Sequence, residues 1–216
     1  DIDQGEKFGL FGSNGAGKTT LISIISGTLK YDEGRVRVLG TDLKKNWSEV
    51  KGKIGIVPQE NAFYDQLSAL ENMTFFGRLY KFESTRLNNR IDELIHDFGM
   101  ETYAKKKASS YSGGMKRKLN LALGVLHNPE LLILDEPTVG VDVKSKTHIN
   151  KYLNKLNEEK QTTFLYTSHM MDEAQQLCSH IGILKDGNVS EKDKTSEFLK
   201  KHKDSNMENI MMNILD

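Results

Sequence analysis

The sequence lacks features that mark several large classes of protein. A single cysteine, Cys178, among 216 residues excludes an internal disulfide framework and fits a reducing compartment. Lysine and arginine together number 30, as do aspartate and glutamate, so the formal net charge is zero. That balance gives no reason to expect a nucleic acid or an anionic membrane surface as a partner.

The chain also lacks a long apolar run. No stretch approaches the roughly 20 consecutive apolar residues of a membrane-spanning helix, and no secretory signal opens the sequence. We therefore expect any role at a membrane to depend on a partner chain. The length suffices for one sizeable domain, or for one domain with a subdomain. Because an apolar strand candidate follows Asp1 almost at once, we expect an N-terminal piece to be missing from the sequence.

What the chain does have is a glycine-rich motif. Residues 12–20 fill every fixed position of the pattern G-x-x-x-x-G-K-[ST], between an apolar strand candidate and an apolar helix candidate. Glycines let the backbone bend around phosphates, and the helix N-terminus attracts anions. In such a loop Lys18 reaches the β- and γ-phosphates, and the Thr19 hydroxyl ligates Mg²⁺. The predicted nucleotide-binding residues are Gly12, Ser13, Asn14, Gly15, Ala16, Gly17, Lys18, Thr19 and Thr20. A glycine-rich turn that binds nothing is the alternative, and the number of agreeing positions disfavours it.

Apolar strand candidates alternate with helical patterns, which predicts an α/β fold with a largely parallel sheet. The expected strands are Phe8–Phe11, Val36–Leu39, Ile54–Val57, Leu131–Leu134, Thr163–Tyr166 and Ile181–Leu184. The second of these follows turn residues and is expected at an antiparallel edge.

The middle of the chain, residues 67–126, reads as helical. One helix is expected at Ala69–Tyr80, and a second has Ser84 as its expected N-cap and Gly99 as its stop. The apolar residues of the second helix recur at helical spacing; they are Leu87, Ile91, Leu94, Ile95 and Phe98. A helical insertion therefore interrupts the α/β core.

The tail changes in composition from Ser190 onward. Residues 191–204 are dense in lysine and acidic residues, and we expect them to be solvated. An apolar helical pattern follows, at Met207, Ile210, Met211 and Ile214. This helix either closes its own domain or frays, which we favour, or it docks on a partner.

Polar residues follow two of the expected strands. Leu131–Leu134 runs into Asp135 and Glu136, as in a Walker B motif. Asp135 can hold Mg²⁺, often through water, and Glu136 can polarise the attacking water as general base. Ligands bind at the carboxyl ends of strands in open α/β folds, so a plain surface turn is the less favoured interpretation. His169 follows the next strand at the same edge, where it can contact the γ-phosphate.

A second glycine motif, Ser112-Gly113-Gly114, opens a helix for which Ser112 is the expected N-cap. Glycines at a helix N-terminus form a further anion site. Because the first glycine loop already serves one γ-phosphate, the second motif indicates a symmetric dimer in which each chain completes the other's site. Taken alone, the tripeptide is also a common turn.

Together these residues resemble the nucleotide-binding subunits of ATP-binding-cassette (ABC) proteins, from about Gly5 to Asn188. Val57–Glu60 resembles the Q-loop of that family, Val139–Asp142 its D-loop, and His169 its switch histidine. The resemblance implies a P-loop NTPase ABC-type core, with a mainly parallel sheet, flanking helices and an antiparallel β edge, plus an inserted α-helical subdomain. It implies an ATP-binding RecA-like core at 1–66 and 127–190, a helical signature subdomain at 67–126 and a C-terminal helical tail at 191–216.

The resemblance also implies roles for residues. Catalytic roles fall on Glu136, His169 and Gln59, and Mg²⁺ contacts fall on Thr19, Gln59 and Asp135. Nucleotide contacts additional to the first loop fall on Ser112, Gly113, Gly114 and Asp142, with the serine and glycines reaching the partner's γ-phosphate. The implied cofactors are ATP and Mg²⁺, and the implied reaction is hydrolysis of ATP to ADP and phosphate.

Residues 111–119, 135–142 and 166–174 resemble exporter subunits, a branch that includes multidrug and antibiotic-resistance systems. The implied partners are transmembrane permease subunits, which face the helical insertion and the Gln59 region, and a second nucleotide-binding subunit, identical or not. No nucleic acid is implied, and the implied place is the cytoplasmic side of the cell membrane. ATP binding closes the dimer, and hydrolysis opens it.

Some positions depart from the family pattern. Met115 replaces a commoner Gln, and Val139 and Val141 replace the usual Ser and Leu of the D-loop. The adenine-stacking aromatic residue of the family lies well before the phosphate-loop lysine, and Lys18 is too close to Asp1 for it; we expect truncation here, with weakened nucleotide affinity. The alternative function is a soluble non-transport ABC ATPase, in iron–sulfur cluster assembly or translation. A regulatory module without turnover is disfavoured because the catalytic residues are present.

Overall fold

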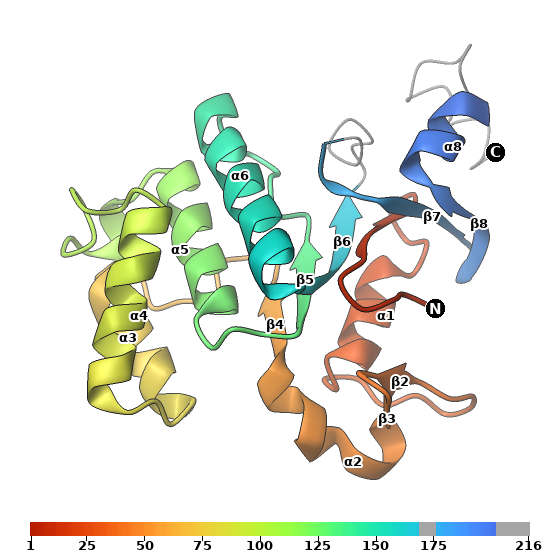
Figure 1. The fold of residues 1–216 in the computed structure, drawn as a ribbon, viewed down its shortest axis with the longest axis horizontal. Coiled ribbons are helices and arrows are strands. Elements are labelled where there is room, and N and C mark those ends of the chain that lie inside the picture. The colour runs from red at the N-terminus through yellow and green to blue at the C-terminus, as the bar shows by residue number, and fades with distance from the viewer. Residues whose placement is uncertain (169–175, 202–216) are drawn as a thin grey trace.

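The computed structural model describes residues 1–168 and 176–201 of the chain. A six-stranded sheet forms its centre, with the strand order β4-β5-β6-β1-β7-β8 (Figure 1). The strands are β1 (Lys7–Phe11), β4 (Ile54–Val57), β5 (Leu131–Asp135), β6 (Thr163–Ser168), β7 (His180–Lys185) and β8 (Asn188–Lys194). Neighbouring strands pair in parallel, except β7 and β8, which are antiparallel. The predicted mainly parallel sheet with an antiparallel edge is confirmed.

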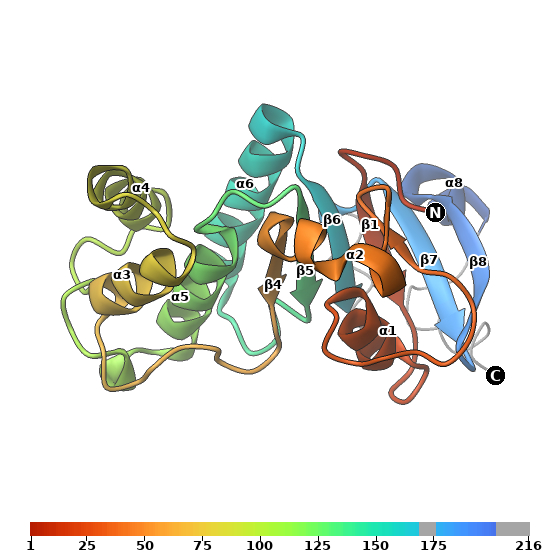
Figure 2. The same cartoon turned by 90° about the horizontal axis from the view of Figure 1, so that it is seen from below.

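Helices cover both faces of the sheet. They are α1 (Lys18–Ile25), α2 (Leu43–Val50), α3 (Ala69–Leu79), α4 (Ser84–Asp97), α5 (Gly113–Val125), α6 (Val143–Lys160) and α8 (Thr195–Lys201), with short 3-10 helices η1 (Lys51–Lys53) and η2 (Ala108–Ser110). Figure 2 shows α1 and α6 on opposite sides of the strands. Because successive side chains of a strand point to opposite faces, Leu134 of β5 packs into the core with α5 and α6, while Ile133 packs with α1 and α2.

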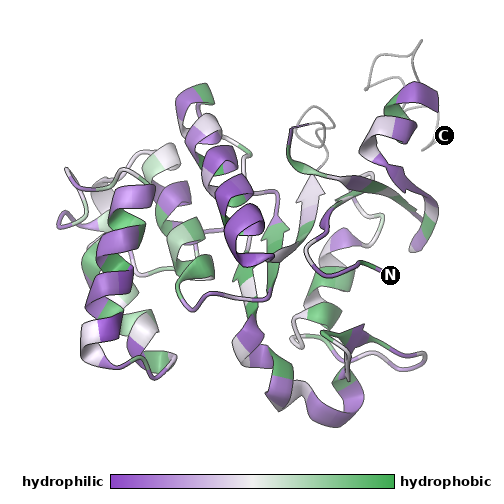
Figure 3. Cartoon of the chain, in the orientation of Figure 1, coloured by the Kyte–Doolittle hydropathy of each residue, from purple (hydrophilic) through white to green (hydrophobic). Residues whose placement is uncertain are grey.

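The hydropathy of the elements matches this layering. Figure 3 shows β5 as hydrophobic and α6 as largely hydrophilic. A strand covered on both faces reads as a continuous apolar run, whereas a helix with one face in solvent does not. Within residues 1–168 and 176–201, no helix combines the length and the apolar character needed to cross a bilayer.

The helical layer stands beside β4. Helix α3 packs there on both α4 and α5, and α5 also packs on β4. Residues 67–126 are all described and form no strand longer than an isolated bridge between Ser68 and Lys107. Ser112 caps α5 as expected, since its hydroxyl accepts a hydrogen bond from the Met115 N–H. The division of the chain into a core and a helical subdomain stays a prediction.

Three local expectations need correction. The N-cap of α4 is Glu83 rather than Ser84, because the Glu83 carboxylate has two oxygens and accepts from two first-turn N–H groups. The expected strand Val36–Leu39 is only two residues long, β2 (Arg37–Val38), and pairs with β3 (Thr41–Asp42) in a separate antiparallel sheet.

The third correction concerns the start of the tail. Residues 191–194, expected in a solvated helical tail, belong to the edge strand β8. Charged side chains are common on edge strands because only one flank is paired and the residues can face water. The apolar pattern at Met207, Ile210, Met211 and Ile214 lies outside the described residues.

Candidate active site

The glycine loop joins β1 to α1 at the carboxyl edge of the sheet. Gly17 is the N-cap of α1 and has φ +106°, a left-handed conformation that favours glycine. Among the described residues no side chain caps this helix. Its first N–H groups have no intrahelical acceptor, so the N-terminus of α1 is suited to an anion.

A hollow of about 450 Å³ lies in front of this helix N-terminus. Strand β4 leads into Gln59 and β5 ends on Asp135, so the parallel strands bring their following residues to the same edge. The hollow is lined by Asn14, Gly15, Gly17, Lys18, Thr19, Thr20, Gln59, Asp135, Glu136 and Val139. The structure thus brings together residues of the glycine loop, the segment after β4 and the end of β5, which are far apart in the sequence.

Lys18 is buried at the base of the loop. Its Nζ donates to the backbone oxygens of Gly12, at 2.7 Å, and Ser13, at 3.0 Å. Burial lowers the pKa of Lys18, and the negative charges of Glu136 and Asp135 oppose that shift. A buried cation held beside two carboxylates gives the hollow both signs of charge, which suits a ligand that carries phosphates and a metal ion.

The two carboxylates have different surroundings. Thr167 of β6 donates its hydroxyl to Asp135 Oδ1 at 2.6 Å, which fixes one carboxylate oxygen. Glu136 is almost fully buried and has φ +45°, an uncommon conformation for a residue with a side chain. Its N–H donates to the Thr167 carbonyl, and Gln59 Nε2 donates to Glu136 Oε2 at 3.1 Å. The turn after β5 therefore aims Glu136 at Gln59.

The remaining predicted site residues lie elsewhere. Ser112 and Asp142 are N-caps of α5 and α6, and a Cβ added to Gly114 would lie 2.7 Å from Asp142 Oδ2. These residues and Gly113 form one group that does not line the hollow around Lys18. His169 lies outside the described residues.

Sequence reasoning missed two residues of α5 that contact the site. Arg117 and Asn120 are buried polar side chains on an otherwise apolar helix face. Burial lowers the pKa of Arg117 to about 10, so it remains charged near neutral pH. A charged residue at an apolar position of the helical pattern was the available signal, and its partners could not be read from the sequence.

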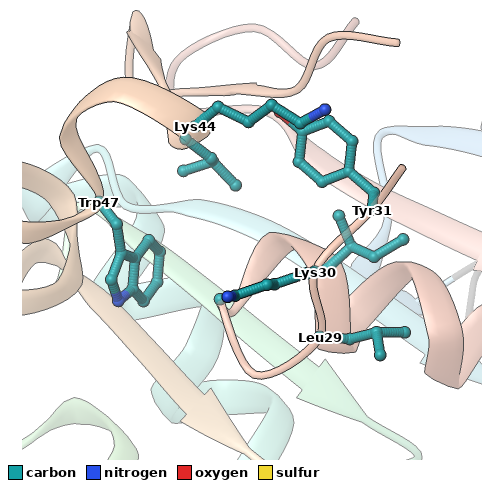
Figure 4. Close-up of a pocket in the computed structure, with 8 residues that line it drawn as sticks. Leu29, Lys30, Tyr31, Lys44 and Trp47 are labelled. Carbon is teal, nitrogen blue, oxygen red and sulfur yellow. The ribbon is translucent and has the colours of Figure 1, made fainter. Parts of the chain in front are cut away.

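A second hollow, of about 400 Å³, lies at the other end of α1 (Figure 4). Its lining comprises Ile24, Gly27, Leu29, Lys30, Tyr31, Leu43, Lys44 and Trp47. Lys44 Nζ lies 4.4 Å from the centre of the Tyr31 ring and donates to the Asp32 carbonyl. No carboxylate side chain is among the lining residues, so the acid–base groups gather only in the first of these two hollows.

Comparison with known proteins identifies relatives over most of the chain. A family model described as ABC transporter matches residues 1–139. The linearmycin resistance ATP-binding protein LnrL of Bacillus subtilis is 45% identical over 188 residues, which are 87% of this chain and 60% of that protein. The ABC transporter ATP-binding protein NatA of the same species is 37% identical over 189 residues, which are 87% of this chain and 76% of that protein. The chain thus spans about three-fifths of the length of LnrL.

Solved structures share the fold. The ATP-binding cassette MJ0796, in a dimeric post-hydrolysis state bound to ADP and phosphate, superposes with a TM-score of 0.81 and 28% identity, covering 90% of this chain and 87% of that one. An ATP-binding subunit of an ABC transporter superposes with a TM-score of 0.85 over 98% of this chain and 89% of that one. Its sequence is 23% identical, so this second likeness shows the fold alone.

Proposed function

The chain belongs to the ABC transporter family, and from this premise we propose that it binds ATP in the hollow around Lys18 and hydrolyses it to power export through separate transmembrane subunits. The observation that carries the proposal is the meeting of Lys18, Gln59, Asp135 and Glu136 around that hollow. The alternative, a soluble non-transport ABC ATPase, is not favoured, because relatives are named as transport and resistance proteins.

The phosphates of ATP are proposed to lie against the loop of residues 12–20. The N-terminus of α1 supplies N–H groups, and Lys18 supplies a positive charge close to the loop backbone. The same surroundings fit Mg²⁺, which prefers oxygen ligands. Thr19, Asp135 and Gln59 are proposed to hold it, with phosphate oxygens and water completing its shell. When bound, the ion neutralises charge that develops on the β- and γ-phosphates.

Glu136 is proposed as the general base. A base must reach the water that it deprotonates, and Glu136 lines the hollow beside the phosphate loop. The Gln59 amide donates to one of its oxygens and so orients the carboxylate. Gln59 thereby has two proposed tasks, one toward the ion and one toward Glu136. His169 is proposed to contact the γ-phosphate.

A second copy of the chain is the proposed completion of the site. Ser112, Gly113, Gly114 and Asp142 form a group away from the Lys18 hollow, and Asp142 caps the adjacent helix α6. In a head-to-tail dimer this group faces the γ-phosphate bound by the partner. The dimeric state of MJ0796 supports this arrangement.

The proposed docking surface for transmembrane subunits is aromatic. Tyr64 follows the Gln59 segment and contacts Phe75 and Phe76 of α3, with ring centres 5.3 and 6.2 Å away. Tyr64 is 53% exposed and Phe75 40% exposed, unlike the buried core around them. Exposed apolar clusters of this kind are suited to a partner, here at the cytoplasmic side of the membrane. Recovery of a polytopic membrane protein with the tagged chain from solubilised membranes checks this partner, and its absence contradicts it.

Replacing Glu136 by Gln tests the catalytic proposal. The amide keeps the shape of the side chain but cannot accept a proton, so we expect ATP turnover to fall by about a hundredfold or more. ATP binding should stay within about threefold of the wild type, because the phosphate loop is unchanged. Phosphate release and fluorescent-nucleotide titration measure the two quantities.

A matched control is Glu130→Gln. Glu130 pairs with Lys53 at the opposite end of β5 and is half exposed, so its loss should leave turnover unchanged. Lys18→Ala should weaken ATP binding itself. Wild-type turnover in the Glu136→Gln variant would remove Glu136 as the base.

A further inference from the structure

Two buried side chains of α5 contact the backbone of the candidate site. Arg117 is 5% exposed and Asn120 is 2% exposed, and the two residues are about one helical turn apart. Burying a charge or an amide costs free energy unless its hydrogen-bonding groups find partners. The partners of these two side chains are therefore informative.

The Arg117 guanidinium donates to four backbone carbonyls in two separate segments. At the end of β5, Arg117 Nη2 donates to the backbone oxygen of Asp135 at 3.1 Å, and two residues further on Arg117 Nε donates to the Pro137 oxygen. After β4, Arg117 Nη1 donates to the oxygens of Pro58, at 2.7 Å, and Gln59, at 3.2 Å. The rigid, planar fork of arginine can hold two segments in a fixed relation, which a single ammonium group cannot do as well.

Asn120 binds the segment after β4 further along. Its Nδ2 donates to the oxygens of Pro58 and Glu60, both at 3.1 Å, and its Oδ1 accepts from the Ala62 N–H at 3.0 Å. Both ends of the amide are thus used on one loop. Three successive carbonyls, at residues 58, 59 and 60, are bound by side chains of α5.

This arrangement sets the position of Gln59 relative to Glu136. Gln59 lies on the loop that both side chains hold, and Glu136 lies between Asp135 and Pro137, whose carbonyls Arg117 binds. The bond from Gln59 Nε2 to Glu136 Oε2 spans these two segments. If the loop shifted by an ångström relative to the turn, the bond would be lost or lengthened.

We propose that Arg117 and Asn120 are positioning residues for ATP hydrolysis, which hold the Gln59 loop and the turn at Glu136 in fixed register. The proposal rests on the proposed function, because it assigns these residues to the same reaction. These two residues also connect helix α5 to Glu136, the proposed general base of the same chain. The first residues of α5 are proposed to contact the nucleotide bound by the partner. Neither residue is among those that line the hollow around Lys18.

The test compares Arg117→Met with Arg90→Met. Arg90 is also 5% exposed, and it also donates to backbone carbonyls, those of Val125 and Leu126, while it pairs with Glu93. The two variants therefore delete the same group at equal burial, but these partners of Arg90 lie in α4 and at the end of α5 rather than in the Gln59 loop or the turn at Glu136. A difference in kcat between the two variants therefore reports the position of the site residues rather than a general loss of stability.

We expect Arg117→Met to lower kcat at least about tenfold, which is ~1.4 kcal/mol, with ATP affinity within about threefold of the wild type. Arg90→Met should lose thermal stability but keep kcat within about twofold. Arg117→Lys, which keeps the charge but has fewer donors, should restore part of kcat. Equal kcat in the Met variants at positions 117 and 90 would overturn the proposal.

A second measurement is independent of turnover. Amide hydrogen exchange of residues 59–62, which follow Pro58, should become faster in Arg117→Met and in Asn120→Leu, and should stay at the wild-type rate in Arg90→Met. If the wild type hydrolyses no ATP, the proposed function fails, and this exchange decides the positioning role alone. Exchange at the wild-type rate in both α5 variants would overturn that role. If Arg117→Met does not fold, the same measurements are made on Arg117→Lys and on Asn120→Leu, which replaces a neutral side chain.

Discussion

Glu136 illustrates how much of this site is decided at single residues. Its φ of +45° turns the chain sharply after β5, and a backbone bond to Thr167 anchors the turn. Uncommon backbone conformations persist where the surrounding structure holds them, and they gather at functional sites. The sequence pattern identified Asp135 and Glu136 as candidates, but it could not show that the Gln59 amide contacts Glu136 or that the Thr167 hydroxyl contacts Asp135.

At Gly27, a side chain would disturb a close packing contact. Gly27 has φ +71°, and an added Cβ would lie 2.6 Å from Cε2 of Trp47, which lines the second hollow (Figure 4). We expect Gly27→Ala to lower the free energy of unfolding by about 1–3 kcal/mol. Trp47 is the single tryptophan, so its fluorescence during urea unfolding measures the change. Gly52→Ala is the control, because nothing lies within 4 Å of its added Cβ; equal losses in both variants would contradict the account.

At the scale of elements, strands and helices with a strong apolar pattern could be predicted from the sequence, whereas exposed elements rich in charged residues could not. Strand β4 matches its expected bounds because Lys53 and Pro58 flank a short apolar run and leave little choice of its ends. Strand β8 was missed because its run of charged residues at 191–194 resembles a solvated segment, and pairing with β7 decides its conformation. The hydrogen bonds of Arg117 and Asn120 could not be predicted from the sequence for the same reason, because they join segments that only the folded chain brings together.

Helix α3 begins with a capping box that predicts a pH dependence. The Ser68 N–H and hydroxyl donate to the Glu71 carboxylate and lower the pKa of Glu71 below its ordinary value of 4.5. Because the folded pKa is the lower one, this stabilisation is complete above about pH 4.5 and is lost as pH falls through the folded pKa. We expect Glu71→Gln to lower the melting temperature at pH 7 and to match the wild type in strong acid.

Thermal unfolding followed by circular dichroism across this pH range measures the effect. Glu33→Gln is a suitable control, because Glu33 is exposed in the turn before β2. A constant difference between Glu71→Gln and wild type at every pH would refute a role for the charge of Glu71.

At the scale of the whole molecule, each proposed ATP site consists of two groups of residues, and one chain carries these two groups at different places on its surface. The phosphate loop and Glu136 lie at one hollow, and the Ser112–Gly114 group with Asp142 lies outside it. The fold class was predictable because six motifs occur in the order of the family. The spatial separation of the two half-sites required the structure, since sequence order does not fix which residues share a hollow.

The most direct test of the account is ATP-dependent dimerisation of the Glu136→Gln variant, measured by light scattering during size exclusion. Without turnover, ATP and Mg²⁺ should trap the closed pair, so we expect a monomer alone and a dimer with nucleotide. Adding Ser112→Arg should abolish the dimer, because the long cationic side chain would occupy the place of the partner's γ-phosphate. A Glu136→Gln protein that binds ATP and stays monomeric, or a Ser112→Arg variant that still dimerises, would contradict the shared site.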